Sequence, residues 1–128
     1  MTRASCACGG LQAEVDGLPR RTAICHCHDC RTRTGSAFSW NAWFDVGRVR
    51  VPDGSKSFER VGDEGSTITY HFCPDCGVTV WYTNSKIDGV AIPAGAFAPD
   101  TAVAPNISVY DERRPGWIGL PDDLERMN

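Results

Sequence analysis

Short stretches of alternating hydrophobic and polar residues recur roughly every ten residues along the chain. In residues 67–72, Ile68, Tyr70 and Phe72 alternate with threonine and histidine. A period of two places the apolar side chains on one face of a β-strand. Clusters of Pro, Gly, Asp and Ser separate the stretches, as turns do. Strands are therefore predicted at residues 4–8, 11–15, 21–24, 58–61, 67–72, 78–82, 90–93 and 107–110, with two more within 37–51 hinged at 46–47.

Helical periodicity is scarce by comparison. The polar segment 31–36 predicts a short helical turn closed by Gly35, and Asp122 is placed to cap a short last turn. The tail from 111 to 128, which carries Trp117, is expected to cover a sheet. With no repeat or linker, 128 residues fit one domain. The prediction is a mainly β protein of short antiparallel strands with little helix, folded as a single domain over residues 1–128.

The charge pattern and the hydropathy of the chain exclude several classes of partner. The formal net charge is −3, and Lys and Arg are scattered rather than clustered. Nucleic acid is therefore not expected as a partner. No apolar run approaches the ~20 residues of a membrane span, and Cys6 interrupts the start before a signal-peptide apolar region forms. No membrane association is expected, and the predicted location is the cytoplasm.

Seven cysteines in such a chain favour metal binding over disulfides. The cytosol keeps thiols reduced, and an odd number of cysteines cannot all pair internally. Three of the seven, Cys25, Cys27 and Cys30, lie within six residues. Cys25 and Cys27 share one side of an extended segment, and a turn then returns Cys30 to the same centre. Three protein ligands leave zinc an open position, the arrangement of catalytic sites.

The four remaining cysteines, Cys6, Cys8, Cys73 and Cys76, are the right number for a closed site. Cys6 and Cys8 are expected on one face of the first strand, whereas Cys73 and Cys76 form a metal-binding turn at a hairpin tip, followed by Gly77. Structural zinc is held by four ligands. The sequence therefore predicts two zinc ions per chain, one structural and one catalytic. The hairpin that delivers the central motif is expected to combine residues 11–15 with 21–24.

These motifs resemble the glutathione-dependent formaldehyde-activating enzyme family, known as GFA. The resemblance is carried by 6-CACG-9, 25-CHCHDCR-31 followed by Gly35 and Ser36, and 72-FCPDCG-77, and it continues through the late strand at 105–109 to 114-RPGW-117. It implies a zinc-bearing β-tent fold with a structural zinc on the outer four cysteines and a catalytic zinc on the central three. Where the family often has an acidic residue, this chain reads Gly95, Ala96, Phe97 and Ala98.

The resemblance also implies a carbon–sulfur lyase activity like that of S-(hydroxymethyl)glutathione synthase. The expected partners are a small thiol such as glutathione and a small aldehyde, formaldehyde by default. Zinc in an open site binds a thiol as thiolate, which then attacks the aldehyde carbon, and the reverse step releases both. Two alternatives stay open: a non-catalytic zinc module that binds glutathione or a protein partner, and an iron–sulfur or redox protein.

Other candidate residues surround the central cysteines. His26 lies between two predicted ligands and is expected to point away from the metal, where it either supports the reaction from behind the ligands or only packs. Arg31 is favoured over Arg33 to bind the carboxylates of glutathione. His28 is mainly expected to be exposed, with ligation at the open zinc position as the alternative, and His71 is expected to be a sheet residue. The predicted catalytic residues are thus Cys25, Cys27, Cys30 and His26.

Overall fold

The computed structural model describes all residues, 1–128, and consists mainly of β-strands. Two sheets are present. The smaller has the strand order β1-β2-β5, and the larger has the order β11-β10-β3-β4-β9-β8-β7-β6. The predicted mainly β class is confirmed. The strands are β1 Thr2–Ser5, β2 Gln12–Val15, β3 Arg21–Cys25, β4 Ser39–Phe44, β5 Val49–Arg50, β6 Lys56–Val61, β7 Thr67–Phe72, β8 Thr79–Asn84, β9 Ile87–Pro93, β10 Ile107–Val109 and β11 Glu125–Met127.

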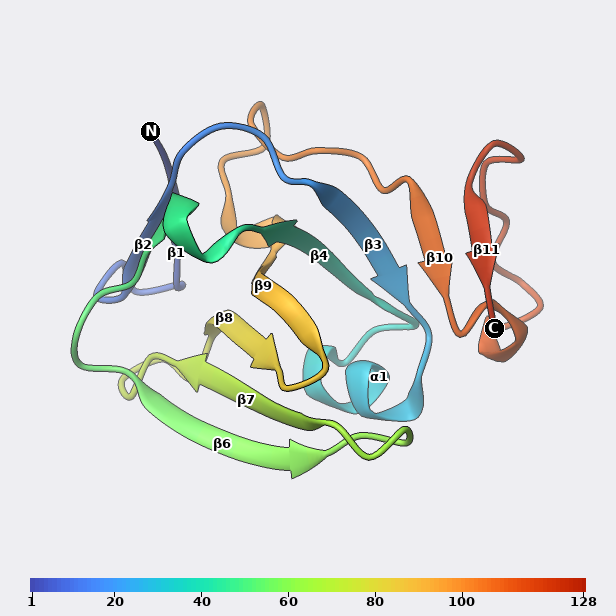
Figure 1. Cartoon of the computed structure of the whole chain (residues 1–128), viewed down its shortest axis with the longest axis horizontal. Helices are drawn as coiled ribbons and strands as arrows, with labels where there is room; N and C mark the ends of the chain where they lie inside the picture. Colours follow the sequence, from blue (N-terminus) through green and yellow to red (C-terminus); the bar gives the residue numbers. More distant parts are fainter.

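The eight-stranded sheet is strongly curved. Figure 1 shows it turning from β11, β10, β3 and β4 on one side, through β9, to β8, β7 and β6 on the other. The only α-helix, α1 His28–Thr34, lies directly after β3, and three 3-10 helices, η1 Val46–Arg48, η2 Ala94–Ala96 and η3 Asp111–Arg113, complete the elements. The curvature leaves the two halves of the sheet facing each other. None of the helices is long and apolar enough to cross a membrane.

The main core lies between the small sheet and the middle of the large one. Leu11, Val15, Val80 and Ile92 are at most 2% exposed and belong to one cluster of buried residues. A second cluster on the inner side of the curved sheet contains Trp43, Ile68, Tyr70, Tyr82 and Ala91. Burial of such side chains, at roughly 25 cal/mol per Å² of apolar surface, is the main term that stabilises the fold. The second cluster also forms a wall of the site described below.

The structure corrects three predictions about the strands. Cys6 and Cys8 do not lie on the first strand, because β1 ends at Ser5 and the chain turns through Gly9 with φ of +81°. Segments 11–15 and 21–24 do not form one hairpin, because β2 pairs with β1 and β5 whereas β3 pairs with β4 and β10. The sheet is not wholly antiparallel, because β10 runs parallel to both β3 and β11.

Of the two predictions about helical segments, the one at 31–36 is corrected, and a turn is present at Asp122, where the other places it. The helix predicted at 31–36 begins earlier, at His28, because Cys27 acts as its N-cap, although it ends as predicted with Gly35 in the left-handed conformation at φ of +67°. The last turn predicted at Asp122 is followed by strand β11, which is held by parallel pairing to β10. Trp117, expected as part of a cover, is 81% exposed.

Gly89 in β9 provides a test of this architecture. Its φ is +106°, and an added Cβ would lie 2.5 Å from the carbonyl oxygen of Phe44 in β4. We expect Gly89→Ala to destabilise the fold by about 2 kcal/mol or more, because the left-handed backbone and the backbone clash both oppose it. Gly95→Ala is the matched control, since its Cβ would meet nothing within 4 Å. Urea unfolding of both variants measures the difference, and equal stabilities would contradict the β4–β9 geometry.

Candidate metal centres

The central cluster, defined as Cys25, Cys27 and Cys30, is assembled by a strand end and a helix start. Cys25 is the last residue of β3, Cys27 is the N-cap of α1, and Cys30 lies in its first turn. Their Sγ atoms all lie within 4.8 Å of one another. The Cys30 N–H donates to Cys27 Sγ at 3.3 Å, so the sulfur takes the place of the usual capping oxygen. The turn predicted between the second and third cysteines is the start of a helix.

The outer cluster, defined as Cys6, Cys8, Cys73 and Cys76, joins two turns that are distant in sequence. The first turn follows β1 and the second connects β7 to β8, and the four Sγ atoms lie within 4.8 Å of one another. Cys8 Sγ is 3.6 Å from Cys73 Sγ. Backbone N–H groups turn toward the sulfurs, that of Leu11 donating to Cys6 Sγ at 3.2 Å. The predicted division into four and three cysteines matches the geometry.

The sulfur atoms of each cluster perturb one another strongly. Hydrogen bonds with Cys25 and then Cys27 lower the pKa of Cys30 to about 2. Hydrogen bonds with Cys27 and then Cys30 raise the pKa of Cys25 far above its usual value. In the outer cluster, the backbone N–H of Val78 lowers the pKa of Cys76 to about 6.

Cys8 shows the opposite balance in the outer cluster. Gly10 N–H lowers the pKa of its thiol, but the sulfurs of Cys73 and Cys6 outweigh this and raise the pKa to about 12. The neighbouring sulfurs therefore resist simultaneous ionisation, because thiolates this close repel one another. A cation with a preference for thiolate removes this conflict, and sets of four and three sulfurs fit zinc. Two zinc sites are consistent with the two clusters.

A cavity of about 390 Å³ opens onto the central cluster. Its volume is in the range typical of small-ligand sites. It lies between the two halves of the curved sheet, and its aromatic wall is formed by Tyr70 of β7 together with Trp43 of β4 and Tyr82 of β8, whose ring centres are 5.8 Å apart. All three central cysteines line it, Cys27 and Cys30 being 7% exposed. The cluster is therefore buried but reachable from one side.

Charged side chains also line this cavity. Arg60 Nη1 donates to Asp29 Oδ2 at 2.9 Å, and Arg60 Nε donates to the Tyr70 hydroxyl oxygen at 2.8 Å. Burial raises the pKa of Tyr70, against a smaller lowering by Arg60, so the phenol stays protonated at neutral pH. Behind the two tyrosines, the Arg33 guanidinium lies 5.0 Å from the ring centre of Tyr70 and 5.3 Å from that of Tyr82. A fixed positive field thus surrounds the aromatic wall.

His26 lies behind the central cluster rather than in the cavity. Its side chain is 0% exposed, and Nε2 is 2.9 Å from Ser108 Oγ on β10. Because the Ser108 hydroxyl donates to Asp111 Oδ1 at 2.8 Å, its oxygen accepts from His26 Nε2–H. Asp111 also accepts from Arg126 Nη1 at 3.1 Å. Burial is the main cause that lowers the pKa of His26, and it keeps the ring neutral.

The other predicted side chains fall outside the cavity lining. Arg31 is exposed and borders a separate open depression together with Trp117. His28 is exposed near Thr32, and His71 stacks on Trp81 with ring centres 4.7 Å apart. The carboxylate-binding role predicted for Arg31 thus has no support from the shape of the cavity.

Sequence reasoning missed most of the cavity wall. Asn41, Tyr70, Tyr82 and Arg60 read as ordinary strand residues, since nothing local distinguishes them. A usable signal did exist in β4, where polar Ser39 and Asn41 occupy buried positions in an otherwise apolar strand. Buried polar residues require partners and often mark sites.

Comparisons with known proteins agree with this arrangement. The family model described as glutathione-dependent formaldehyde-activating enzyme, GFA, matches residues 1–113. A search of the curated proteins gave no match. Among solved structures, a Rhodobacter sphaeroides protein determined by structural genomics is similar, with a TM-score of 0.60 and 18% identity over 76% of this chain and 88% of that chain. At 18% identity, the similarity to this solved structure supports the fold alone.

The hydrogen bonds of Ser108 give a test of how His26 is held. Ser108→Ala leaves His26 Nε2–H without its acceptor in a place that water does not reach. We expect a loss of about 1–3 kcal/mol in the free energy of unfolding. Ser57→Ala, at an exposed position of β6, is the control and should change stability by less than about 0.5 kcal/mol. Urea titrations compare the two, and an unaffected Ser108→Ala protein would show that this network contributes nothing.

Proposed function

The chain belongs to the glutathione-dependent formaldehyde-activating enzyme family, and from this premise we propose that it binds a small thiol, such as glutathione, at Cys25, Cys27 and Cys30. The thiol is joined to, or released from, a small aldehyde. The observation that carries this proposal is the cavity, which ends on the three central sulfurs and on no other cluster of metal ligands.

The two clusters have different proposed roles. The outer cluster is closed by four cysteines and ties distant turns together, which suits a structural zinc. The central cluster holds three sulfurs beside a cavity, which suits a catalytic zinc. Zinc held there supplies an open coordination position for a thiolate and Lewis acidity for carbon–sulfur chemistry.

Tyr70 is the residue of this chain best placed to handle the aldehyde oxygen. Its hydroxyl oxygen accepts from Arg60 Nε at 2.8 Å, so its own proton is free to be donated into the cavity. When the thiolate sulfur bonds to the aldehyde carbon, the carbonyl electron pair moves to oxygen, which then takes up a proton. A phenol held protonated at this wall stabilises that developing charge. Release of the aldehyde reverses each transfer.

His26 acts by positioning rather than by contact with the substrate. Its backbone connects two cysteines of the central cluster, and its ring is fixed through Ser108 to the C-terminal strands. This attachment restrains the loop between β3 and α1 on the side away from the cavity. The catalytic role predicted for His26 is accordingly proposed as support of the ligand loop.

The activity is tested by the rate of exchange between free aldehyde and its glutathione adduct, followed by NMR with labelled formaldehyde. We expect the protein to accelerate exchange and Tyr70→Phe to lower that acceleration by about tenfold or more. Tyr110→Phe, which changes another tyrosine of the same cavity, is the control and should keep the wild-type rate. Saturable glutathione binding without any acceleration would instead favour a non-catalytic thiol-binding module.

If the outer cluster is structural and the central cluster binds the thiol, substitutions in the two clusters should have different effects: one should impair folding and the other should impair thiol binding. Cys73→Ser removes a ligand from the outer cluster, where metal binding contributes free energy of about 10 kcal/mol, comparable to a domain's whole stability. We expect an insoluble or unfolded protein. Cys27→Ser keeps an oxygen acceptor at the helix N-cap and should leave a folded protein with about one zinc ion and no thiol binding.

Thermal melts, elemental analysis and thiol titration of the two variants measure these outcomes. Wild-type protein should carry about two zinc ions and no visible absorption, whereas a brown colour would point to an iron–sulfur centre. Equal unfolding of both variants would show that the clusters do not differ in the way proposed.

A further inference from the structure

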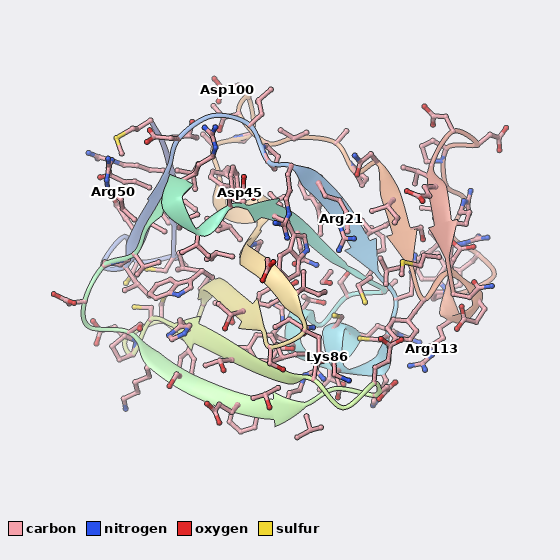
Figure 2. The ribbon with its side chains drawn as sticks, viewed as in Figure 1. Arg21, Asp45, Arg50, Lys86, Asp100 and Arg113 are labelled. Atoms are coloured by element: carbon pink, nitrogen blue, oxygen red, sulfur yellow. The ribbon has the colours of Figure 1, made fainter.

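A second cavity, of about 510 Å³, lies between helix α1 and the strands β6 to β8. This cavity, the α1 groove, is defined by Arg33 of α1 with Phe58, Phe72 and Thr79 of the sheet. The central cavity, by contrast, is bordered by Lys86 and by Asp63, the ion-pair partner of Arg113, and Figure 2 labels Lys86 and Arg113. No cysteine lines the α1 groove, so it is a pocket apart from both metal centres.

The sheet side of the α1 groove is a row of aromatic rings. Phe58 of β6 is paired across the strands with Tyr70 of β7, so their side chains share a face, and Phe72 follows on that face two positions later. Tyr70 is 6% exposed, Phe72 is half-buried and Phe58 is 61% exposed. The outer part of this row is apolar surface that an aromatic ring of a ligand can cover.

The helix side of the α1 groove carries a cation without a partner. The Arg33 guanidinium lies 5.0 Å from the ring centre of Tyr70, but it forms no hydrogen bond and no ion pair. Its Nε and Nη2 are buried without an acceptor, whereas Nη1 is not buried. Because the side chain is half-buried and lines the groove, Nη1 is the nitrogen that a ligand can reach. A half-buried guanidinium without an acceptor favours an anion beside it.

The other charges of the lining do not balance Arg33. Arg60 is the second cation, and Asp29, the only carboxylate of the lining, is paired with it at 2.9 Å. Two guanidinium groups against one carboxylate leave a single positive charge uncompensated. A monoanion such as a carboxylate complements this charge, and the aromatic row complements an apolar group attached to it.

We propose that the α1 groove binds a small carboxylate that carries an aromatic ring, at a site separate from the central cluster. The carboxylate of the ligand accepts from Arg33 Nη1, and its ring packs on Phe58 and Phe72. The site does not depend on the proposed thiol chemistry, because no sulfur of either cluster lines the groove.

Binding is tested by NMR titration of the zinc-loaded, isotope-labelled protein with phenylacetate. We expect saturable shifts of backbone amides in α1 and β6, with a Kd of about 1 mM or lower, as a ligand of this size allows. Phenylacetamide keeps the ring and lacks the charge, whereas acetate keeps the charge and lacks the ring. Each should bind at least about fivefold more weakly than phenylacetate, because each loses one of the two contacts.

Two variants separate the contribution of the charge from that of the ring. Arg33→Gln should raise the Kd of phenylacetate by about tenfold and leave the Kd of phenylacetamide within about twofold of wild type. Phe58→Ala should raise the Kd of both by about threefold, because each ligand carries the ring. Arg31→Gln is the matched control, since Arg31 lies two positions earlier on α1, is exposed and does not line the groove. It should change neither Kd by more than about twofold.

The remaining outcomes overturn the site. Shifts centred on β3 and β4, whose residues line only the central cavity, would place phenylacetate there instead. Equal affinities for phenylacetate and phenylacetamide would show that Arg33 recognises no charge. Shifts that fail to saturate with every probe would reject the site and leave the proposed thiol chemistry untouched. Phe58 is mostly exposed, so its variant carries the comparison if Arg33→Gln unfolds.

Discussion

The meeting of four sulfur atoms from two remote turns is the constraint on which the arrangement of the two sheets depends. Cys8 and Cys73 are 65 positions apart, yet their sulfurs are separated by only 3.6 Å. This contact fixes the end of the small sheet against the β7–β8 turn, and the larger core forms between them. The same turn joins β7, which carries Tyr70, to β8, which carries Tyr82, so the outer cluster also helps to position these two cavity-lining tyrosines.

Much of the strand pattern could be predicted from the sequence, since alternation over a half-buried sheet is a local signal. The strand predicted at 67–72 has the observed bounds of β7. Strand β11 could not be predicted, because its residues, Glu125 to Met127, are exposed and owe their extended form to pairing with β10. The prediction that Cys6 and Cys8 lie on a strand is wrong for a related reason. In a strand, the backbone N–H groups of Gly10 and Leu11 would pair with a neighbouring strand, but here they donate to the sulfurs of Cys8 and Cys6.

The cysteine sets of the candidate site follow from spacing, but the wall of its cavity does not. The number of cysteines and their spacing within each motif are enough to predict that their sulfurs share a metal site. Asn41, Tyr70 and Arg60 converge only because the large sheet curves back on itself, a property of many strands together. Position in the sequence alone favours Arg31, which directly follows the central cysteines. The helix directs that side chain outward, whereas Arg21, ten positions earlier, reaches the cavity from β3.

Alternation along β3 and β4 has a consequence for how such a protein can diversify. The inward positions 21, 41 and 43 touch the cavity, whereas Thr22 and Ala42, between them in sequence, point into the rest of the fold. A substitution at an inward position therefore alters the shape or charge offered to a ligand while leaving both sulfur clusters and the outward packing in place. In this fold, substitutions can therefore change which ligand is preferred while the metal-binding cysteines stay the same.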